Sequence, residues 1–97
     1  MGTEQNMRLH LFVDGIVQGV GFRFFIYQLG VDFKLFGWVK NKLNGSVEIL
    51  AEGPRDKLEI LLKQAKKGPR MAEVINVDIN WDLPKNDLPP FTLHPTD

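Results

Sequence analysis

With 97 residues and a mass of 11.1 kDa, the chain is long enough for one small domain and too short for two, because each half would bury too little apolar surface to fold. Hydrophobic residues make up 43% and charged residues 25%, which excludes a disordered or low-complexity protein. Lys and Arg together number 12, and Asp and Glu also number 12. With zero net charge, any anion must be held by a local site and not by the overall field.

The chain contains no cysteine, which excludes disulfides, zinc–thiolate centres and a thiolate nucleophile. Its first residues are polar and lack the basic start and apolar run of a secretory signal, so we expect a cytoplasmic protein. No stretch approaches the roughly 20 apolar residues that span a bilayer. We expect residues 1–6 to be a flexible tail and residues 7–97 to form a single domain.

The first elements are indicated by a change of hydrophobic period. Apolar and polar residues alternate from Arg8 to Asp14, which predicts a strand buried on one face. The segment 15–21 holds three glycines in seven residues and is therefore predicted to be a loop. From Phe22 to Phe33 the apolar spacing becomes i, i+3, i+4, which predicts a helix of about three turns, weakened at Gly30.

A hairpin and a second helix are predicted next. The strands 36–42 and 46–52 flank Leu43, Asn44 and Gly45, where Asn-Gly supplies the positive φ values of a tight turn. Pro54 suits a first helical turn, and the apolar face that follows continues to Lys67, where Gly-Pro stops the helix.

The last predicted elements are strands. Residues 73–82 alternate, with Ile75, Val77, Ile79 and Trp81 on one side, and residues 91–94 suggest a short edge strand after a proline-punctuated loop. The order strand, helix, strand, strand, helix, strand predicts an α+β fold of the ferredoxin-like βαββαβ type, with an antiparallel sheet and both helices on one face.

The glycine-rich segment from Gly15 to Arg23 carries the most chemical information. It leads from a strand into a helix N-terminus, where free amides and the helix dipole attract an anion and the Arg23 fork can grip two phosphate oxygens. No Lys-Ser or Lys-Thr follows the glycines, and the spacing is not Gly-x-Gly-x-x-Gly, which disfavours ATP and dinucleotides. Glycine spacing alone fits a tight connection beside a surface arginine better than an anion site.

A longer pattern contains this loop and continues through most of the chain. Its residues are Gly15, Val17, Gln18, Gly19, Val20, Gly21, Phe22, Arg23, Phe25, Gly37, Trp38, Val39, Asn41, Gly45, Val47, Glu48, Gly53, Pro54, Gly68, Pro69 and Ala72. In order and spacing, this pattern closely resembles the acylphosphatase family from about Leu9 to Phe91.

The resemblance implies a ferredoxin-like fold and hydrolysis of the mixed anhydride between a carboxylic acid and phosphate. It assigns phosphate binding to Arg23 and the positioning of water to Asn41. The loop residues that it assigns to the phosphate are Gly15, Val17, Gln18, Gly19, Val20, Gly21 and Phe22. We expect a monomer that acts on a small-molecule acyl phosphate and needs no cofactor or metal.

The chain departs from the family pattern mainly on the helix that follows the loop. Ile26 stands where members often have threonine, Gly30 where alanine is common, and Phe33-Lys34 where Leu-Gly is frequent. These departures concern the packing of the helix more than its chemistry. Lys40 replaces a frequent arginine beside Asn41, which keeps the charge but loses the planar fork.

The implied reaction requires few catalytic groups. Its leaving group is a carboxylate whose conjugate acid has a pKa of about 4, so it departs at neutral pH without a general acid. Phosphoryl transfer then asks mainly for positioning and for stabilisation of charge on the phosphate oxygens. We therefore expect His10 and His94 to be structural, and Gln18 to shape the loop more than to touch substrate.

Two other functions remain open. Phe12, Trp38 and Leu50 are expected on the helix-free face, where RNA-binding domains of this fold stack bases. The Lys/Arg-Gly-Phe/Tyr-Gly/Ala-Phe-Val signature is absent from the third strand, however, and the net charge is zero, so nucleic-acid binding is disfavoured. The third possibility is a regulatory module, since similar domains open larger carbamoyl-transferring maturation proteins.

Overall fold

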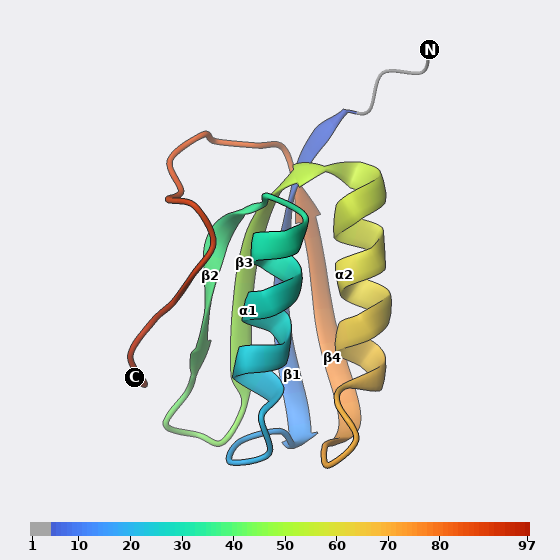
Figure 1. The fold of residues 1–97 in the computed structure, drawn as a ribbon, viewed down its shortest axis with the longest axis vertical. Helices are drawn as coiled ribbons and strands as arrows, with labels where there is room; N and C mark the ends of the chain where they lie inside the picture. The colour runs from blue at the N-terminus through green and yellow to red at the C-terminus, as the bar shows by residue number, and fades with distance from the viewer. Residues whose placement is uncertain (1–4) are drawn as a thin grey trace.

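The computed structural model describes residues 5–97, so most of the predicted tail lies outside the described residues. The elements are β1 (Asn6–Ile16), α1 (Phe22–Asp32), β2 (Phe36–Asn41), β3 (Val47–Pro54), α2 (Arg55–Lys67), β4 (Glu73–Asp82) and β5 (Thr92–Leu93). Their order confirms the predicted ferredoxin-like arrangement, and both helices cover the same face of the sheet (Figure 1). Neither helix of this described part has the length and apolar character needed to cross a bilayer.

The sheet has the strand order β4-β1-β3-β2-β5. The four long strands pair antiparallel, as predicted, but β5 runs parallel to β2 through Trp38↔Thr92 and Val39↔Leu93. The sheet is therefore mixed, and not wholly antiparallel. The reason is that β4 ends at the same end of the sheet at which β2 begins. The connection 83–91 crosses along this end, so β5 starts beside the start of β2 and runs in the same direction (Figure 1).

The pairing of β1 with β4 contains a register shift, and two predictions are wrong because of it. Gly15 belongs to β1 and not to the loop, because its φ of +132° and its missing side chain let β4 approach: a Cβ there would lie 2.1 Å from the Glu73 carbonyl oxygen. The shift between Asp14 and Gly15 leaves Ile75 without a pairing partner, and its side chain is 74% exposed. Val74 packs against the core in its place. A bulge of this kind breaks the period of two that the sequence pattern assumes.

The core lies between the sheet and the two helices. Its largest fully buried side chains are Phe22, Leu9, Leu11, Ile26, Leu35, Ile49, Leu58, Leu61, Val13, Val17, Val39 and Val47. Gly30, where a weakened helix was predicted, is buried against the ring of Phe91, and a Cβ there would lie 2.3 Å from that ring. The missing side chain thus makes room for Phe91, which anchors the chain just before β5.

The turn between β2 and β3 is wider than the predicted Asn-Gly turn. Only Gly45 has a positive φ, at +97°, whereas Asn44 uses its side-chain oxygen to accept hydrogen bonds from the amide and the hydroxyl of Ser46, at 3.0 and 2.7 Å. Asparagine therefore stabilises this turn through its side chain and not through a left-handed backbone. Pro54 ends β3 and caps α2, one residue before the predicted helical position.

Candidate active site

The loop between β1 and α1 alternates between residues of negative and positive φ. Gly19 and Gly21 have φ values of +75° and +80°, whereas Gln18 before them and Val20 between them have negative φ. Alternation of this kind makes successive N–H groups converge into a concavity that suits an anion. A Cβ on either glycine would meet nothing within 4 Å, so these positions require glycine for backbone conformation and leave open space above the loop.

The N-terminus of α1 is free to bind an anion. Its cap residue is Gly21, which has no side chain to accept a hydrogen bond from the first turn, and that turn contains no acidic residue. The first amides of a helix lack internal partners and carry the positive end of the dipole. The structure thus leaves at this point the donors that a phosphate group would accept.

Arg23 lies in the first turn of α1 and is half-buried. Its Nη1 donates to the carbonyl oxygen of His94 at 3.4 Å, and no carboxylate among residues 5–97 forms an ion pair with its guanidinium. Because a partly buried cation gains most from an anion that it can hydrogen-bond directly, Arg23 is suited to a ligand of negative charge.

Asn41 ends β2 and presents a polar atom without a partner. Its Oδ1 is buried and accepts no hydrogen bond from any of residues 5–97. A buried acceptor without a donor costs about 1–3 kcal/mol of folding free energy, so such atoms are rare unless a ligand or a water satisfies them. Asn41 is therefore the described side chain best prepared to hold a small hydrogen-bond donor.

Gln18 connects the loop to the strand end that carries Asn41. Its Nε2 donates to the carbonyl oxygens of Lys42 and Ser46, both at 2.8 Å, so the loop is tied to the β2–β3 turn. These two hydrogen bonds fit the loop-shaping role expected of the Gln18 side chain. On the other side of β2, the amide of Asp97 donates to the Asn41 carbonyl oxygen at 3.1 Å, which holds the backbone of Asn41 between two neighbours.

These features open into one cavity of about 260 Å³. It is lined by Val17, Gly19, Gly21, Phe22, Arg23, Phe24, Asn41 and Leu93. The structure thus brings six of the nine residues predicted for the site together, whereas Gly15 lies in β1, and Gln18 and Val20 do not line the cavity. Sequence reasoning missed Phe24 and Leu93. The available signal was that Phe24 is apolar at a helix position outside the i, i+3, i+4 spacing.

The comparisons with known proteins decide the family. The family model for acylphosphatases matches residues 9–93. This chain belongs to the acylphosphatase family. Over 94 residues it is 45% identical to an acylphosphatase of Koribacter versatilis, which covers 97% of this chain and 86% of that relative. The match confirms the family that the sequence pattern resembled.

Solved acylphosphatase structures share the fold. The crystal structure of acylphosphatase from Bacillus subtilis superposes with a TM-score of 0.86 at 36% identity, covering 91% of this chain and 98% of that one. The structure of T. kodakarensis HypF gives a TM-score of 0.78 at 32% identity, and covers 94% of this chain but 12% of that one. The acylphosphatase fold thus occurs both as a protein of this length and as a part of a larger chain.

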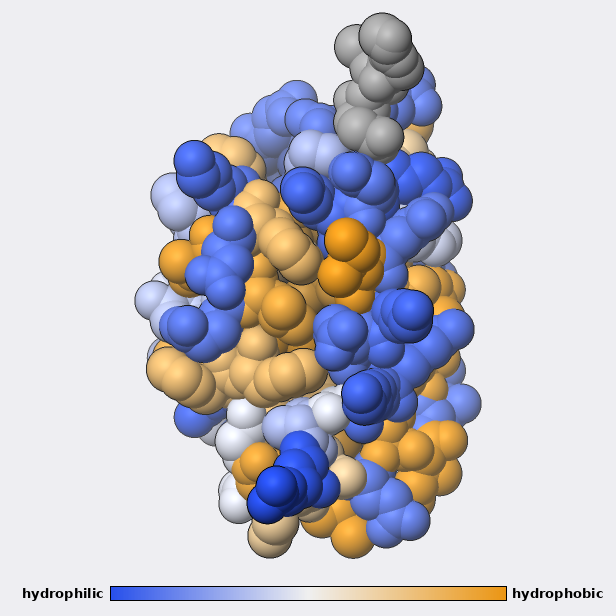
Figure 2. Space-filling model, turned by 45° about the vertical axis from the view of Figure 1, so that its right-hand side comes forward, coloured by the Kyte–Doolittle hydropathy of each residue, from blue (hydrophilic) through white to orange (hydrophobic). Residues whose placement is uncertain are grey.

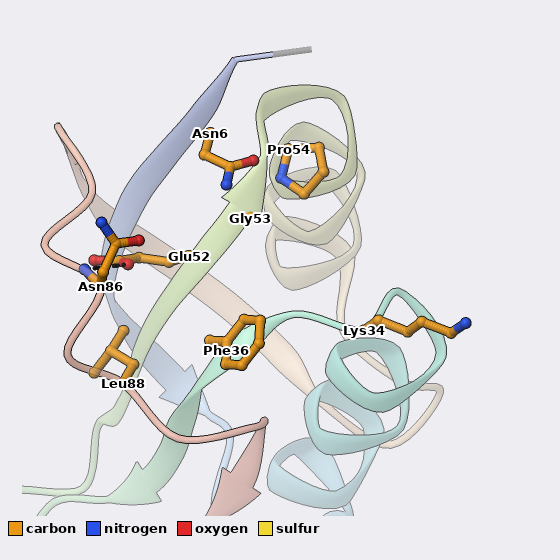
Figure 3. Close-up of a pocket in the computed structure, with 8 residues that line it drawn as sticks. All are labelled: Asn6, Lys34, Phe36, Glu52, Gly53, Pro54, Asn86 and Leu88. Atoms are coloured by element: carbon orange, nitrogen blue, oxygen red, sulfur yellow. Dashed lines mark hydrogen bonds between the residues drawn. The ribbon is translucent and has the colours of Figure 1, made fainter. Parts of the chain in front are cut away.

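A larger cavity lies at the opposite end of the sheet. Its volume is about 440 Å³, and its lining residues are Asn6, Lys34, Phe36, Glu52, Gly53, Pro54, Asn86 and Leu88 (Figure 3). The Glu52 carboxylate is already occupied, since it accepts hydrogen bonds from Arg8 and from the amides of Lys85 and Asn86. This carboxylate therefore pins the 83–90 loop to β3, and it is not free for chemistry.

We expect the Glu52→Gln variant to be less stable than the wild type at neutral pH and almost equally stable in acid. Burial raises the pKa of Glu52. This effect is smaller than the combined lowering by the hydrogen bonds from Lys85, Arg8 and Asn86 and by the Arg8 charge, so the pKa lies below its ordinary value. The ionised form is thus favoured by folding, and its contribution is present above the pKa of the unfolded chain and is lost as the pH falls through the lower pKa of the folded chain.

Urea unfolding at several pH values measures this effect. The variant is expected to unfold with about 1–3 kcal/mol less free energy at pH 7, and the difference should shrink between about pH 5 and pH 3. Glu59→Gln is the matched control, because Glu59 pairs with Arg55 on the exposed side of α2 and should cost under about 0.5 kcal/mol. A difference for Glu52→Gln that stays constant with pH would show that its charge is not involved.

Several side chains on the helix-free face of the sheet contact one another. The ring of Trp38 is stacked by His94 at 5.0 Å between centroids, and the Lys40 ammonium lies 4.7 Å from the Trp38 ring centre. His10 is 2.7 Å from the Glu48 carboxylate. Both histidines thus have contacts within the fold, and among residues 5–97 no group of three or more His, Asp or Glu side chains is placed to hold a metal ion.

Proposed function

We propose that the cavity between the β1–α1 loop and the end of β2 is the active site at which this acylphosphatase hydrolyses its substrate. The amides of the loop and of the first turn of α1, together with Arg23, hold the phosphate group of an acyl phosphate, and Asn41 orients the attacking water. The observation that carries the proposal is the buried, unpartnered Oδ1 of Asn41, a residue that lines the same cavity as Arg23 and the uncapped helix N-terminus.

The residues suit an in-line displacement. Water attacks the phosphorus, the bond between phosphorus and the acyl oxygen breaks, and the carboxylate leaves with the electron pair. The proton of the water passes to a phosphate oxygen, so that the products are a carboxylate and inorganic phosphate. The Asn41 carbonyl accepts a hydrogen bond from the water, while Arg23 and the amides stabilise the charge on the phosphate oxygens.

The proposed reaction needs no acid to protonate its leaving group. A carboxylate with a conjugate-acid pKa of about 4 departs at neutral pH without protonation. No general acid is needed beside the scissile bond, and the residues that line the cavity include no histidine or carboxylate. Metal ions are likewise not required, because Arg23 and the helix N-terminus supply positive charge to the phosphate.

The test is hydrolysis by the purified protein of acetyl phosphate and of phenyl phosphate, whose phenol leaving group has a pKa of about 10, like that of tyrosine. We expect turnover of acetyl phosphate, little of phenyl phosphate, and no change on addition of EDTA. Equal activity on both substrates would contradict the leaving-group argument, and loss of activity in EDTA would contradict metal independence.

A monomer that works in the cytoplasm and binds no nucleic acid completes the proposal. The zero net charge and the Trp38 ring already stacked by His94 support the absence of nucleic-acid binding. Size-exclusion chromatography should give the elution volume of an 11.1 kDa species, unchanged by single-stranded RNA. A salt-sensitive shift with RNA would favour the base-stacking function instead.

A further inference from the structure

Phe24 is exposed although it lies on a helix that packs against the sheet. The buried residues of α1 are Phe22, Ile26 and Gly30, and Phe24 points away from that face with 59% of its surface exposed. Its ring contact is with Tyr27 on the next turn, at 5.9 Å between centroids. An exposed Phe side chain keeps apolar surface in water, so the core does not account for its presence here.

Leu93 supplies a second exposed apolar side chain to the same cavity. It lies in β5, is 39% exposed, and lines the cavity together with Phe24. The apolar wall formed by Phe24 and Leu93 thus comes from two elements far apart in the sequence. Figure 2 shows hydrophobic residues gathered on the side of the molecule where α1 lies, next to the more hydrophilic surface of α2. The cavity therefore has a polar end for the phosphate and an apolar wall next to it.

The remaining space and charge of the cavity indicate what lies against this wall. A volume of about 260 Å³ leaves room beyond one phosphorus and its four oxygens. Arg23 is the one charged side chain among the lining residues, and the proposed function assigns it to the phosphate. A carboxylate on the far end of the acyl group would lose water against Phe24 and Leu93 without gaining a cation, which is unfavourable.

We propose that Phe24 and Leu93 bind the acyl group, and that the enzyme therefore prefers acyl phosphates whose acyl group is apolar and uncharged, aromatic groups above all. An aromatic acyl group can pack on the Phe24 ring and bury the apolar wall, whereas an acetyl group is too short to cover it. This inference rests on the proposed function, because it takes the phosphate to be held by Arg23 and the loop.

The experiment compares kcat/KM for benzoyl, acetyl and succinyl phosphate, the last of which carries a carboxylate at the far end. The wild type should prefer benzoyl phosphate. Phe24→Ala should lower kcat/KM for benzoyl phosphate about 10-fold relative to acetyl phosphate, the size expected for loss of one apolar contact in a pocket. Leu93→Ala should change the same ratio in the same direction. Comparing each variant with the wild type cancels the different intrinsic reactivities of the substrates.

Matched controls separate the apolar wall from general effects. Phe36→Ala removes a ring that is 48% exposed and lines the opposite cavity, and Leu83→Ala removes a leucine that is 69% exposed and does not line this one. Both controls should leave the benzoyl-to-acetyl ratio unchanged. Circular dichroism and thermal melting check folding, and if Phe24→Ala does not fold, Phe24→Leu and Leu93→Ala decide with the same ratio.

The outcomes distinguish this inference from the function on which it rests. A wild type that hydrolyses none of the three substrates would overturn the proposed function. If the wild type hydrolyses all three but Phe24→Ala and Leu93→Ala lower kcat/KM for each by the same factor, the apolar wall does not select the acyl group. A wild type that prefers succinyl phosphate would overturn the charge argument directly.

Discussion

The Arg23→Ala variant is expected to lose about 100-fold or more in kcat/KM, with both a higher KM and a lower kcat. Arg23 lines the cavity from the first helical turn of α1, and no carboxylate among residues 5–97 neutralises it. If its fork holds two phosphate oxygens, its loss weakens the ground state and the transition state together, which explains the effect on both constants. Steady-state kinetics with acetyl phosphate measures the change.

Two further variants show whether the geometry of Arg23 or its charge matters. Arg23→Lys keeps the positive charge but loses the planar fork, so its kcat/KM should lie between those of the wild type and the alanine variant. Arg55→Ala is the control, because Arg55 is exposed at the start of α2 and pairs with Glu59. Wild-type kcat/KM in a folded Arg23→Ala protein would remove Arg23 from the site.

The Asn41→Ala variant is expected to lose about 100-fold in kcat with little change in KM. The proposal gives Asn41 the attacking water and not the phosphate, so its loss should affect the chemical step and leave substrate binding intact. The stability of the fold, in contrast to kcat, should not fall. Because the buried Oδ1 has no partner in the described residues, its removal should leave the melting temperature unchanged or higher.

This combination of lower turnover and undiminished stability is the distinctive result for Asn41. A merely structural asparagine would lose stability on substitution and would affect kcat only through unfolding. Asn80→Ala, on the exposed surface of β4, is the matched control and should change neither quantity. Wild-type kcat in the Asn41→Ala protein would exclude a role in positioning water.

Elements with a regular period could be predicted from the sequence, because burial of one face imposes that period. For this reason the helix predicted from Phe22 and the strand predicted from Arg8 were correct, within two residues of the observed bounds. The loop, Arg23 and Asn41 were assigned through a resemblance, and the structure adds that a single cavity contains both side chains.

Features that depend on contacts between distant segments could not be predicted. The exposure of Ile75 follows from a register shift opposite Gly15, and the alternation within 73–82 carries no information about its partner strand. The meaning of Gly30 depends on Phe91, which lies 61 positions later in the chain. A glycine in a helix pattern indicates weakness in isolation, whereas here it provides space for a ring.

The apolar wall formed by Phe24 and Leu93 was also missed because it depends on contacts between distant segments. Phe24 gave a local signal, but Leu93 joins it only because β5 runs parallel to β2 and brings the chain back beside α1. Gln18 similarly acts through the carbonyls of Lys42 and Ser46, which the sequence places 24 and 28 residues away. Local patterns identify which groups can do chemistry, whereas the tertiary fold determines which groups meet.

The strand order has a consequence for the newly made chain. β1 is among the first segments to leave the ribosome, yet it lies between β3 and β4, and its second edge stays unpaired until residues 73–82 have emerged. An apolar strand with an open edge is a template for pairing with other chains. Translation products that stop before β4 should therefore be the aggregation-prone species, and protection of this edge should arrive only when the ten residues of β4 have emerged.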